Sequence, residues 1–247
     1  MPISAQEMNY LTAYMDEYYG NLSTENAEIG AFLRDSHVRE AGDTGSKKLL
    51  DVACGPSSFY WALFLPAVTE FHGLDAREDS IVYLQNLVDT AAKGEAEPRY
   101  LEIAQWHGFD SVDAAAHVRD IAGRYRTLSV HNIVEPWPYE DGSLNAVMSC
   151  FGIDHVETPE EFLKVLSEAR RVLAPSGTLT LATLCETDSW RCGDMTGACL
   201  FTTAESLKRD LEAVGFEVSF LEERRATTGL EMNQGYEKMV FCRAKKV

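Results

Sequence analysis

The stretch Lys47-Lys48-Leu49-Leu50-Asp51-Val52-Ala53-Cys54-Gly55-Pro56-Ser57 decides the fold. Its apolar run stops in a turn of small residues and then enters an amphipathic segment, which predicts a strand, a tight loop and a helix. A second apolar run, Phe71–Leu74, ends in the carboxylate of Asp75. In doubly wound folds an acidic residue at this position holds ribose hydroxyls. The two runs therefore predict a nucleoside pocket at the carboxyl ends of adjacent parallel strands.

Strand and helix patterns alternate along the rest of the chain. We expect strands at 48–52, 70–74, 127–131, 145–151 and 178–184, a further short strand at 99–103, and an antiparallel pair at 217–223 and 238–244. Helices are expected at 57–65, 79–91, 113–125, 159–173 and 204–214. Such alternation predicts an α/β fold with a doubly wound, mostly parallel sheet of seven strands, covered by helices on both faces.

The first 45 residues are expected to form a separate helical layer. A tyrosine-rich stretch has apolar residues at helical spacing, and Ser23 or Thr24 can cap a second helix. Turn residues at 41–46 mark the end of this layer. We therefore predict an amino-terminal helical lid at 1–45 and a main domain at 46–247.

Composition narrows the class of partner. The 247-residue chain carries a formal net charge of −17 at pH 7, which repels nucleic-acid backbones and anionic membrane surfaces. No apolar run approaches the ~20 residues of a spanning helix, and the first residues lack the basic start and apolar core of a signal peptide. We expect a cytoplasmic protein, a monomer or weak dimer, with no nucleic-acid or membrane partner.

The six cysteines form no Cys-x-x-Cys pair. Cys192 and Cys199 are possible metal ligands, but no histidine or second cysteine pair completes a site with the usual spacing. We therefore expect no metal. Three histidines, His107, His117 and His131, are expected at the surface or at edges.

The loop after the first strand retains one glycine, Gly55, whereas a dinucleotide fingerprint needs three for a pyrophosphate to approach the backbone. S-adenosylmethionine has no phosphates, so one glycine and small neighbours suffice for it. The alternative is an ordinary strand-to-helix turn, with Asp75 as the cap of the following helix. Further on, Arg171–Leu181 indicates a helix end, a Pro-Ser-Gly turn and a buried strand.

Together, the loop that starts at Asp51, the acidic strand end at Asp75 and the turn Leu173–Gly177 resemble class I S-adenosylmethionine-dependent methyltransferases. The resemblance covers residues 47–247. It implies a Rossmann-like methyltransferase fold, S-adenosyl-L-methionine as cofactor and S-adenosyl-L-homocysteine as product. The family usually has a glycine where Ala53 stands, and alanine resists positive φ.

A narrower resemblance rests on four segments. Tyr14-Met15-Asp16-Glu17-Tyr18-Tyr19 resembles the amino-terminal tyrosine segment of the nicotinamide, phenylethanolamine and indolethylamine N-methyltransferases. Gly55-Pro56-Ser57 matches their Gly-Pro-Thr turn, and Phe151–His155 and Leu184–Trp190 resemble their stretches after the fourth and fifth strands. This resemblance implies methyl transfer to a small-molecule amine or aromatic nitrogen.

The resemblance also implies a set of cofactor contacts. Tyr14 and Tyr19 would close over the sulfonium, a cation that aromatic faces attract by ~0.5–2 kcal/mol. Asn132 stands where the family places an aspartate near the adenine amino group. The alternative for the tyrosines is the apolar stripe of a packed helix, which we favour for Tyr18. The cofactor set comprises Tyr14, Tyr19, Asp51, Ala53, Gly55, Ser57, Asp75, Ala76, Asn132, Ile133 and Cys150.

On the substrate side, Asp154 matches an acidic contact, and Glu186, Thr187 and Asp188 compete for a second role beside Trp190. The catalytic set implied is Asp154, Glu186 and His155, and the substrate-binding set is Tyr18, Asp154, Glu186, Thr187 and Trp190. An acidic site suits a cationic small molecule. Two alternatives stay open: an O-methyltransferase of a small phenol or hydroxy metabolite, with His155 as base, and a non-catalytic S-adenosylmethionine-binding protein.

Overall fold

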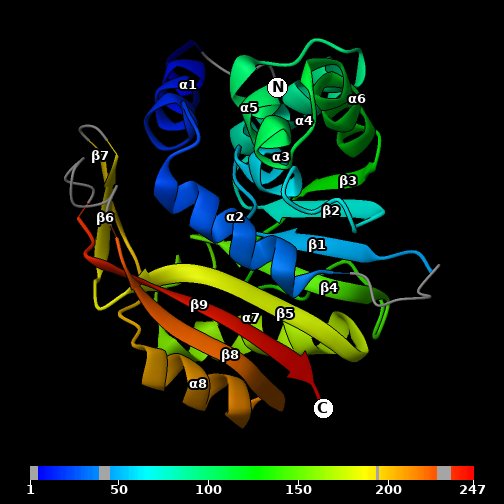
Figure 1. The fold of residues 1–247 in the computed structure, drawn as a ribbon. Coiled ribbons are helices and arrows are strands. Elements are labelled where there is room, and N and C mark those ends of the chain that lie inside the picture. Colours follow the sequence, from blue (N-terminus) through cyan, green and yellow to red (C-terminus); the bar gives the residue numbers. More distant parts are fainter. Residues whose placement is uncertain (1–4, 39–44, 193–194, 227–234) are drawn as a thin grey trace. The chain divides into compact units, whose positions relative to one another are not determined.

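The computed structural model describes residues 5–38, 45–192, 195–226 and 235–247 (Figure 1). The expected turn at 41–46 falls mostly outside these residues. The strands of the main sheet follow the order β3-β2-β1-β4-β5-β9-β8. Neighbours β2/β3, β1/β4 and β4/β5 are parallel, whereas β5/β9 and β8/β9 are antiparallel. The expected doubly wound, mostly parallel sheet of seven strands is confirmed.

The chain divides into two compact units, Met1–Lys47 with Cys54–Val130 and Lys48–Ala53 with His131–Val247. The first contains α1 (Ala5–Tyr19), α2 (Thr24–Ser36), α3 (Ser58–Ala62), β2 (Glu70–Asp75), α4 (Glu78–Ala92), α5 (Pro98–Trp106), α6 (Ser111–Ala122) and β3 (Tyr125–Val130). The second contains β1 (Lys48–Val52), β4 (Leu144–Cys150), α7 (Pro159–Val172), β5 (Leu173–Cys185), β6 (Ser189–Cys192), β7 (Met195–Ala198), α8 (Ala204–Ala213), β8 (Phe216–Arg225) and β9 (Lys238–Lys246).

In the first unit, capping residues and proline mark where helices begin. Ser23 caps α2, because its Oγ accepts a hydrogen bond from the Asn26 amide at 3.0 Å. The short strand expected at 99–103 is wrong, since these residues lie in helix α5. Pro98 opens that helix, and its buried residues Tyr100, Ile103 and Ala104 follow helical rather than alternating spacing.

In the second unit, α7 packs on β5 and α8 packs along β8 (Figure 1). Thr158 caps α7 by accepting from the Glu161 amide at 3.2 Å, and Arg170 and Arg171 lie in its last turn, where they complement the helix dipole. Strand β5 starts earlier than expected, at Leu173, because the Pro-Ser-Gly turn is absorbed as a shift in its pairing with β4. The β6–β7 hairpin was not expected from the sequence.

Three neighbouring strands of the second unit end in strained backbone. The first residue after each of β1, β4 and β5 is left-handed without being glycine: Ala53 has φ 51°, Phe151 has φ 56° and Glu186 has φ 58°. Each such residue costs about 1–2 kcal/mol. Strain of this kind clusters at functional sites, and the carboxyl ends of strands are where doubly wound folds bind ligands.

We expect Ala53→Gly to raise the free energy of unfolding by about 1 kcal/mol, because glycine adopts φ 51° without the Cβ penalty. Urea denaturation monitored by tryptophan fluorescence measures the change. Ala62→Gly, in helix α3, is the control and should destabilise the protein. A less stable Ala53→Gly variant would contradict the assignment of strain to this residue.

Among the described residues, no helix combines the length and apolarity needed to cross a bilayer.

Candidate functional site

Asp75 fastens the glycine loop to the end of β2. Its side chain is buried, its Oδ2 accepts from the Gly55 amide at 2.9 Å and its Oδ1 accepts from the Arg77 amide at 2.9 Å. The cap position of α4 is Arg77, with no side-chain cap, so Asp75 does not cap that helix. The two backbone bonds fix the orientation of the carboxylate at the strand end. Of the other expected contacts in this unit, Ser57 is buried and Ala76 is exposed.

The tyrosine segment of α1 forms a ring cluster. The centroid of the Tyr14 ring is 4.9 Å from that of Tyr18 and 5.9 Å from that of Tyr19. Burial, and then the neighbouring Tyr19 hydroxyl, raise the pKa of Tyr14. Tyr19 is 3% exposed and lies 4.9 Å from Tyr60 and edge-on to Trp61, in the core of the first unit. Tyr14 and Tyr18 are half-buried.

The second unit holds the expected contacts after β1 and β4. Asp51 is buried within β1, and Cys150, the last residue of β4, has a pKa raised by burial and by Asp51. The loops that follow touch, since a Cβ on Gly152 would lie 2.6 Å from the Ala53 carbonyl oxygen. Only glycine fits at residue 152 while the loop after β1 keeps this course.

Asn132 and Ile133 form the turn after β3. The Asn132 side-chain oxygen accepts from the Val134 amide at 3.3 Å, and the side chain is otherwise exposed. Ile133 is buried, and its carbonyl accepts from the Trp137 indole N–H at 2.9 Å. The turn therefore already uses the amide oxygen that we expected near an adenine.

Asp154 is the most unusual side chain of the second unit. It is 1% exposed, and neither carboxylate oxygen has a hydrogen-bond partner among the described residues. The buried Thr183 hydroxyl is also without a partner in the described part of the chain. Burial raises the pKa of Asp154, and the neighbouring His155 offsets this only in part. Since a buried carboxyl group without a donor is costly, Asp154 is a candidate for contact with a ligand.

Residues 199–202, which we call the strap, hold the loops after β4 and β5 through backbone bonds. The Leu200 amide donates to the Asp154 carbonyl at 2.8 Å, and the Cys199 amide donates to the Asp188 carbonyl at 2.9 Å. The Glu186 amide donates to the Thr202 carbonyl at 2.8 Å. Burial raises the pKa of the Cys199 thiol to about 12, with contributions from Asp154 and Asp188. Sequence reasoning missed the strap because it acts through peptide groups.

The β6–β7 hairpin adds an aromatic wall next to Asp154. The rings of His155 and Trp190 are stacked, with centroids 5.6 Å apart and planes 14° apart. Trp190 packs over Gly197, where a Cβ would come within 2.4 Å of the indole. Thr187 was expected to face the substrate. Its hydroxyl donates to the Ser189 carbonyl at 2.9 Å, so it stabilises the backbone of the loop.

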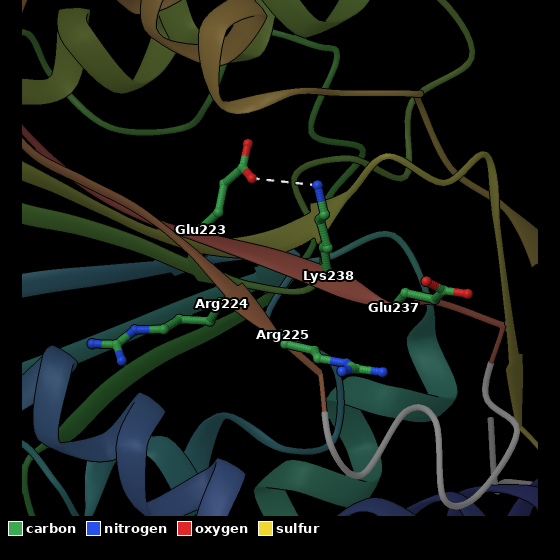
Figure 2. Close-up of a pocket in the computed structure, with 5 residues that line it drawn as sticks. All are labelled: Glu223, Arg224, Arg225, Glu237 and Lys238. Atoms are coloured by element: carbon green, nitrogen blue, oxygen red, sulfur yellow. Dashed lines mark hydrogen bonds and ion pairs between the residues drawn. The ribbon is translucent and has the colours of Figure 1, made fainter.

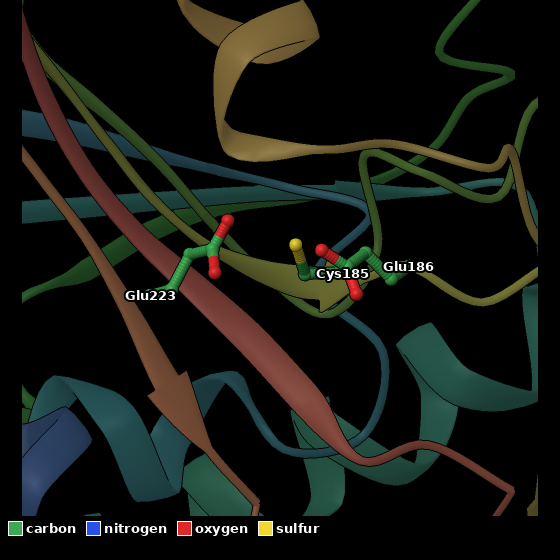
Figure 3. A group of neighbouring side chains, drawn as sticks. All are labelled: Cys185, Glu186 and Glu223. Atoms are coloured by element: carbon green, nitrogen blue, oxygen red, sulfur yellow. The ribbon is translucent and has the colours of Figure 1, made fainter.

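Glu186 belongs to a charged cluster at the ends of β5, β8 and β9. The Cys185 sulfur and carboxylate oxygens of Glu186 and Glu223 all lie within 4.8 Å of one another. Figure 3 shows these three side chains side by side. Lys238 Nζ is 2.8 Å from the Glu186 carboxylate and 3.5 Å from that of Glu223. The ammonium already supplies the cation of this cluster, so we assign no metal to it. The side chain of Cys192 lies outside the described residues.

A pocket of about 240 Å³ borders this cluster; it is lined by Glu223, Arg224, Arg225, Glu237 and Lys238 (Figure 2). Glu223 and Lys238 face each other, whereas Arg224 and Arg225 extend away from that pair (Figure 2). The lining side chains therefore do not converge on one ligand, and the organised part of this region is the Glu186–Lys238–Glu223 cluster.

The surface placement of His117 is wrong. It is 8% exposed, one ring nitrogen lies 3.2 Å from the Leu63 carbonyl oxygen, and burial lowers its pKa. It lies on the buried face of α6, which the helical spacing of that segment could have indicated. His107 is half-buried, and burial, with His117 and Arg34, lowers its pKa to about 4. These histidines therefore pack the first unit in their neutral form.

Comparison with known protein families shows which family the chain belongs to. Residues 26–219 match a family model described as a methyltransferase domain. The chain belongs to this methyltransferase family. A search of curated proteins finds no match. The methyltransferase is a class I enzyme that uses S-adenosylmethionine, as the sequence predicted. The narrower relation to the small-amine N-methyltransferases is not part of this result.

Solved structures share the fold of the methyltransferase at low identity. An S-adenosylmethionine-dependent methyltransferase from Methanosarcina mazei is 16% identical, with a TM-score of 0.59 over 86% of this chain and 96% of that one. The geranyl diphosphate C-methyltransferase from Streptomyces coelicolor A3(2), solved with Mg²⁺, geranyl diphosphate and S-adenosyl-L-homocysteine, is 13% identical, with a TM-score of 0.56 over 90% and 78%. The [4+2]-cyclase SpnF is 17% identical, with a TM-score of 0.60 over 92% and 83%.

Proposed function

We propose that this methyltransferase transfers the methyl group to the nitrogen of a small-molecule amine or aromatic heterocycle. The observation that carries the proposal is Asp154, a buried carboxyl group with no hydrogen-bond partner among the described residues. A cation or an N–H donor is the ligand that such a group needs. The position of Asp154 within Phe151–His155, and of Trp190 after β5, supports membership of the nicotinamide, phenylethanolamine and indolethylamine group.

The cofactor contacts are proposed for each unit separately. In the first unit, Asp75 accepts from the ribose hydroxyls, a role that suits a carboxylate fixed by two backbone amides at a strand end. Tyr14, supported by the packed ring of Tyr19, lies against the sulfonium, and α1 and α2 serve as the lid. The remaining proposed contacts in this unit are backbone groups and small side chains, which the cofactor would meet at Gly55, Ser57 and Ala76.

In the second unit, the proposed cofactor contacts are Asp51, Ala53, Asn132, Ile133 and Cys150. Asp51 lies within β1, Cys150 ends β4, and the other three residues follow β1 or β3. Ala53 is strained, as expected of a site that positions a ligand. When bound, S-adenosylmethionine supplies an electrophilic methyl carbon and leaves as S-adenosyl-L-homocysteine.

The residues of the chain have two tasks in this reaction. The first is alignment of the acceptor nitrogen, which can supply about 7–11 kcal/mol of the rate enhancement. The second is proton transfer. An alkylammonium with a pKa near ~10.4 must lose a proton before it can attack, and the Asp154 carboxylate can accept that proton and pass it to the exposed His155 and water. An aromatic nitrogen needs no base, and Asp154 then stabilises the positive charge that develops.

A panel of amines, azines and phenols tests the proposal. Each compound is incubated with the enzyme and S-adenosylmethionine, and the products are read by mass for one added methyl group. We expect amines or azines to gain one methyl group, which is attached to their nitrogen. Methylation of phenols alone would overturn the proposal and favour O-methylation.

His155 carries the rival function. Its imidazole is exposed and stacked on Trp190, where it could take the proton of a hydroxyl acceptor. In an N-methyltransferase with Asp154 as base, we expect His155→Ala to lower kcat by less than about tenfold. A loss above about a hundredfold, with S-adenosylmethionine affinity unchanged in calorimetry, is the size of effect expected of a general base and would favour the O-methyl function.

A further inference from the structure

Among the residues that the structure describes, two buried polar side chains of the second unit, Asp154 and Thr183, have no hydrogen-bond partner. Each residue is 1% exposed. Asp154 lies in the loop after β4, and Thr183 lies near the end of β5. Both carboxylate oxygens and the Thr183 hydroxyl oxygen are therefore kept from water without receiving a hydrogen bond. Such an arrangement is costly for folding alone, and it indicates a ligand that brings donors.

The backbone brings these two side chains together. The Phe151 amide, at the start of the loop after β4, donates to the Ala182 carbonyl at 2.7 Å, which fixes this loop to β5 next to Thr183. Thr183 lies near enough to Asp154 to act on the pKa of its carboxyl group. The neighbouring Cys199 thiol stays protonated, because burial raises its pKa to about 12. The pair therefore combines one acidic group with one neutral acceptor, and the thiol adds no second negative charge.

We propose that Asp154 and Thr183 together form a subsite for a primary ammonium group, and that Thr183 determines its specificity. The inference rests on the proposed function, which makes Asp154 the contact of a nitrogen acceptor, and it narrows that acceptor to a primary amine. A primary ammonium carries three N–H donors, and the two carboxylate oxygens and the hydroxyl oxygen supply one acceptor for each. The hydroxyl hydrogen can point to the carboxylate, which has further acceptor sites.

The same count of donors limits the reaction to one methyl group. A single methyl transfer produces a secondary ammonium, which has one N–H donor fewer. One of the three buried oxygens then loses its donor, and an unsatisfied buried acceptor is costly. The product therefore binds less tightly than the substrate, and a second methyl transfer is disfavoured.

Binding of three related amines tests the proposal. Benzylamine, N-methylbenzylamine and N,N-dimethylbenzylamine are all cationic at neutral pH and differ in the number of their N–H donors. Each is titrated calorimetrically into the full-length enzyme loaded with S-adenosyl-L-homocysteine. We expect Thr183→Val to bind benzylamine roughly tenfold more weakly than the wild type, the effect of one hydrogen bond to a charged group. It should also lose the preference of the wild type for benzylamine over N-methylbenzylamine, whereas Thr183→Ser should keep it.

Thr180→Val is the matched control. Thr180 is a fully buried threonine of the same strand, and its hydroxyl also lacks a partner within the described ranges. Alternation along the strand places it on the opposite face of the sheet from Thr183, so Thr180→Val should bind the three amines as the wild type does. Both valine variants should resist urea at least as well as the wild type, because each removes an unsatisfied buried hydroxyl.

Three outcomes would overturn the subsite: equal benzylamine affinity in Thr183→Val and the wild type, a Thr183→Val variant that unfolds at lower urea, or no binding of benzylamine to the wild type. The proposed function fails separately. If the amines bind in the expected order while only hydroxyl acceptors are methylated, the subsite stands and N-methylation does not. If azines are methylated and Thr183→Val has no effect on amine binding, N-methylation stands and the subsite does not.

Discussion

Replacing Asp154 with asparagine is expected to stop methyl transfer and at the same time to stabilise the protein. Loss of the proton acceptor should lower kcat by at least about a hundredfold, the usual contribution of a general base. The free energy of unfolding at neutral pH should rise, because the neutral amide cannot ionise, whereas the raised pKa of Asp154 shows that its charged form is disfavoured in the folded protein. Initial rates and urea denaturation measure the two effects.

The stability effect also has a definite pH dependence. Burial raises the pKa of Asp154, so between the ordinary pKa of aspartate and this raised value the folded protein holds a proton that the unfolded chain releases. The wild type should therefore lose stability as the pH rises from the ordinary pKa of aspartate through the raised value, and Asp154→Asn should lack this loss. Glu160→Gln, an exposed acid in the first turn of α7, is the control for charge. A destabilised and fully active Asp154→Asn would refute the role proposed for this residue.

Replacing Asp75 with alanine is expected to abolish S-adenosylmethionine binding. The change removes the two charge-assisted bonds to ribose that we propose for this carboxylate, each worth about 1.5–3 kcal/mol, which together correspond to a loss of roughly a hundredfold to ten-thousandfold in affinity. It also removes the acceptors of the Gly55 and Arg77 amides, so the glycine loop loses its attachment to β2. Isothermal titration calorimetry with S-adenosyl-L-homocysteine gives the affinity.

Two further variants separate these effects. Asp75→Asn keeps one oxygen acceptor and the size of the side chain, so it should bind the cofactor more tightly than Asp75→Ala but more weakly than the wild type. Glu78→Gln, in the first turn of α4, removes a nearby charge outside the proposed contact and should bind normally. Unchanged affinity in Asp75→Ala would remove Asp75 from the cofactor site.

Elements whose ends are set by residues within their own segment were predicted correctly from the sequence. Helix α7 was predicted almost to the residue because its cap, proline and terminal arginines all lie within its own segment. Helix α5 was mistaken for a strand because five residues of mixed polarity fit both periods, and only packing decides between them. The position of Asp75 at the end of β2 was predicted because an acidic residue directly after an apolar run can be recognised in the sequence alone.

The rest of the candidate site depends on pairing between distant segments. The partner of Glu186 is Lys238, from a strand that follows it by about fifty residues, and no spacing rule joins the two. The strained φ at Phe151 and Glu186 has no signature in residue type, since neither is glycine. The missing partners of Asp154 become visible only when its burial is known.

Residues 199–202 have a practical consequence for redesign. Peptide groups of residues 199–202 hold the backbone at Asp154, Glu186 and Asp188, so the side chains of Leu200 and Phe201 can be varied without releasing those three anchors. Phe201 is 58% exposed and Leu200 is half-buried, so both offer room for exchange. A library randomised at these two residues would therefore vary the side chains next to the backbone of Asp154 while its anchor stays in place.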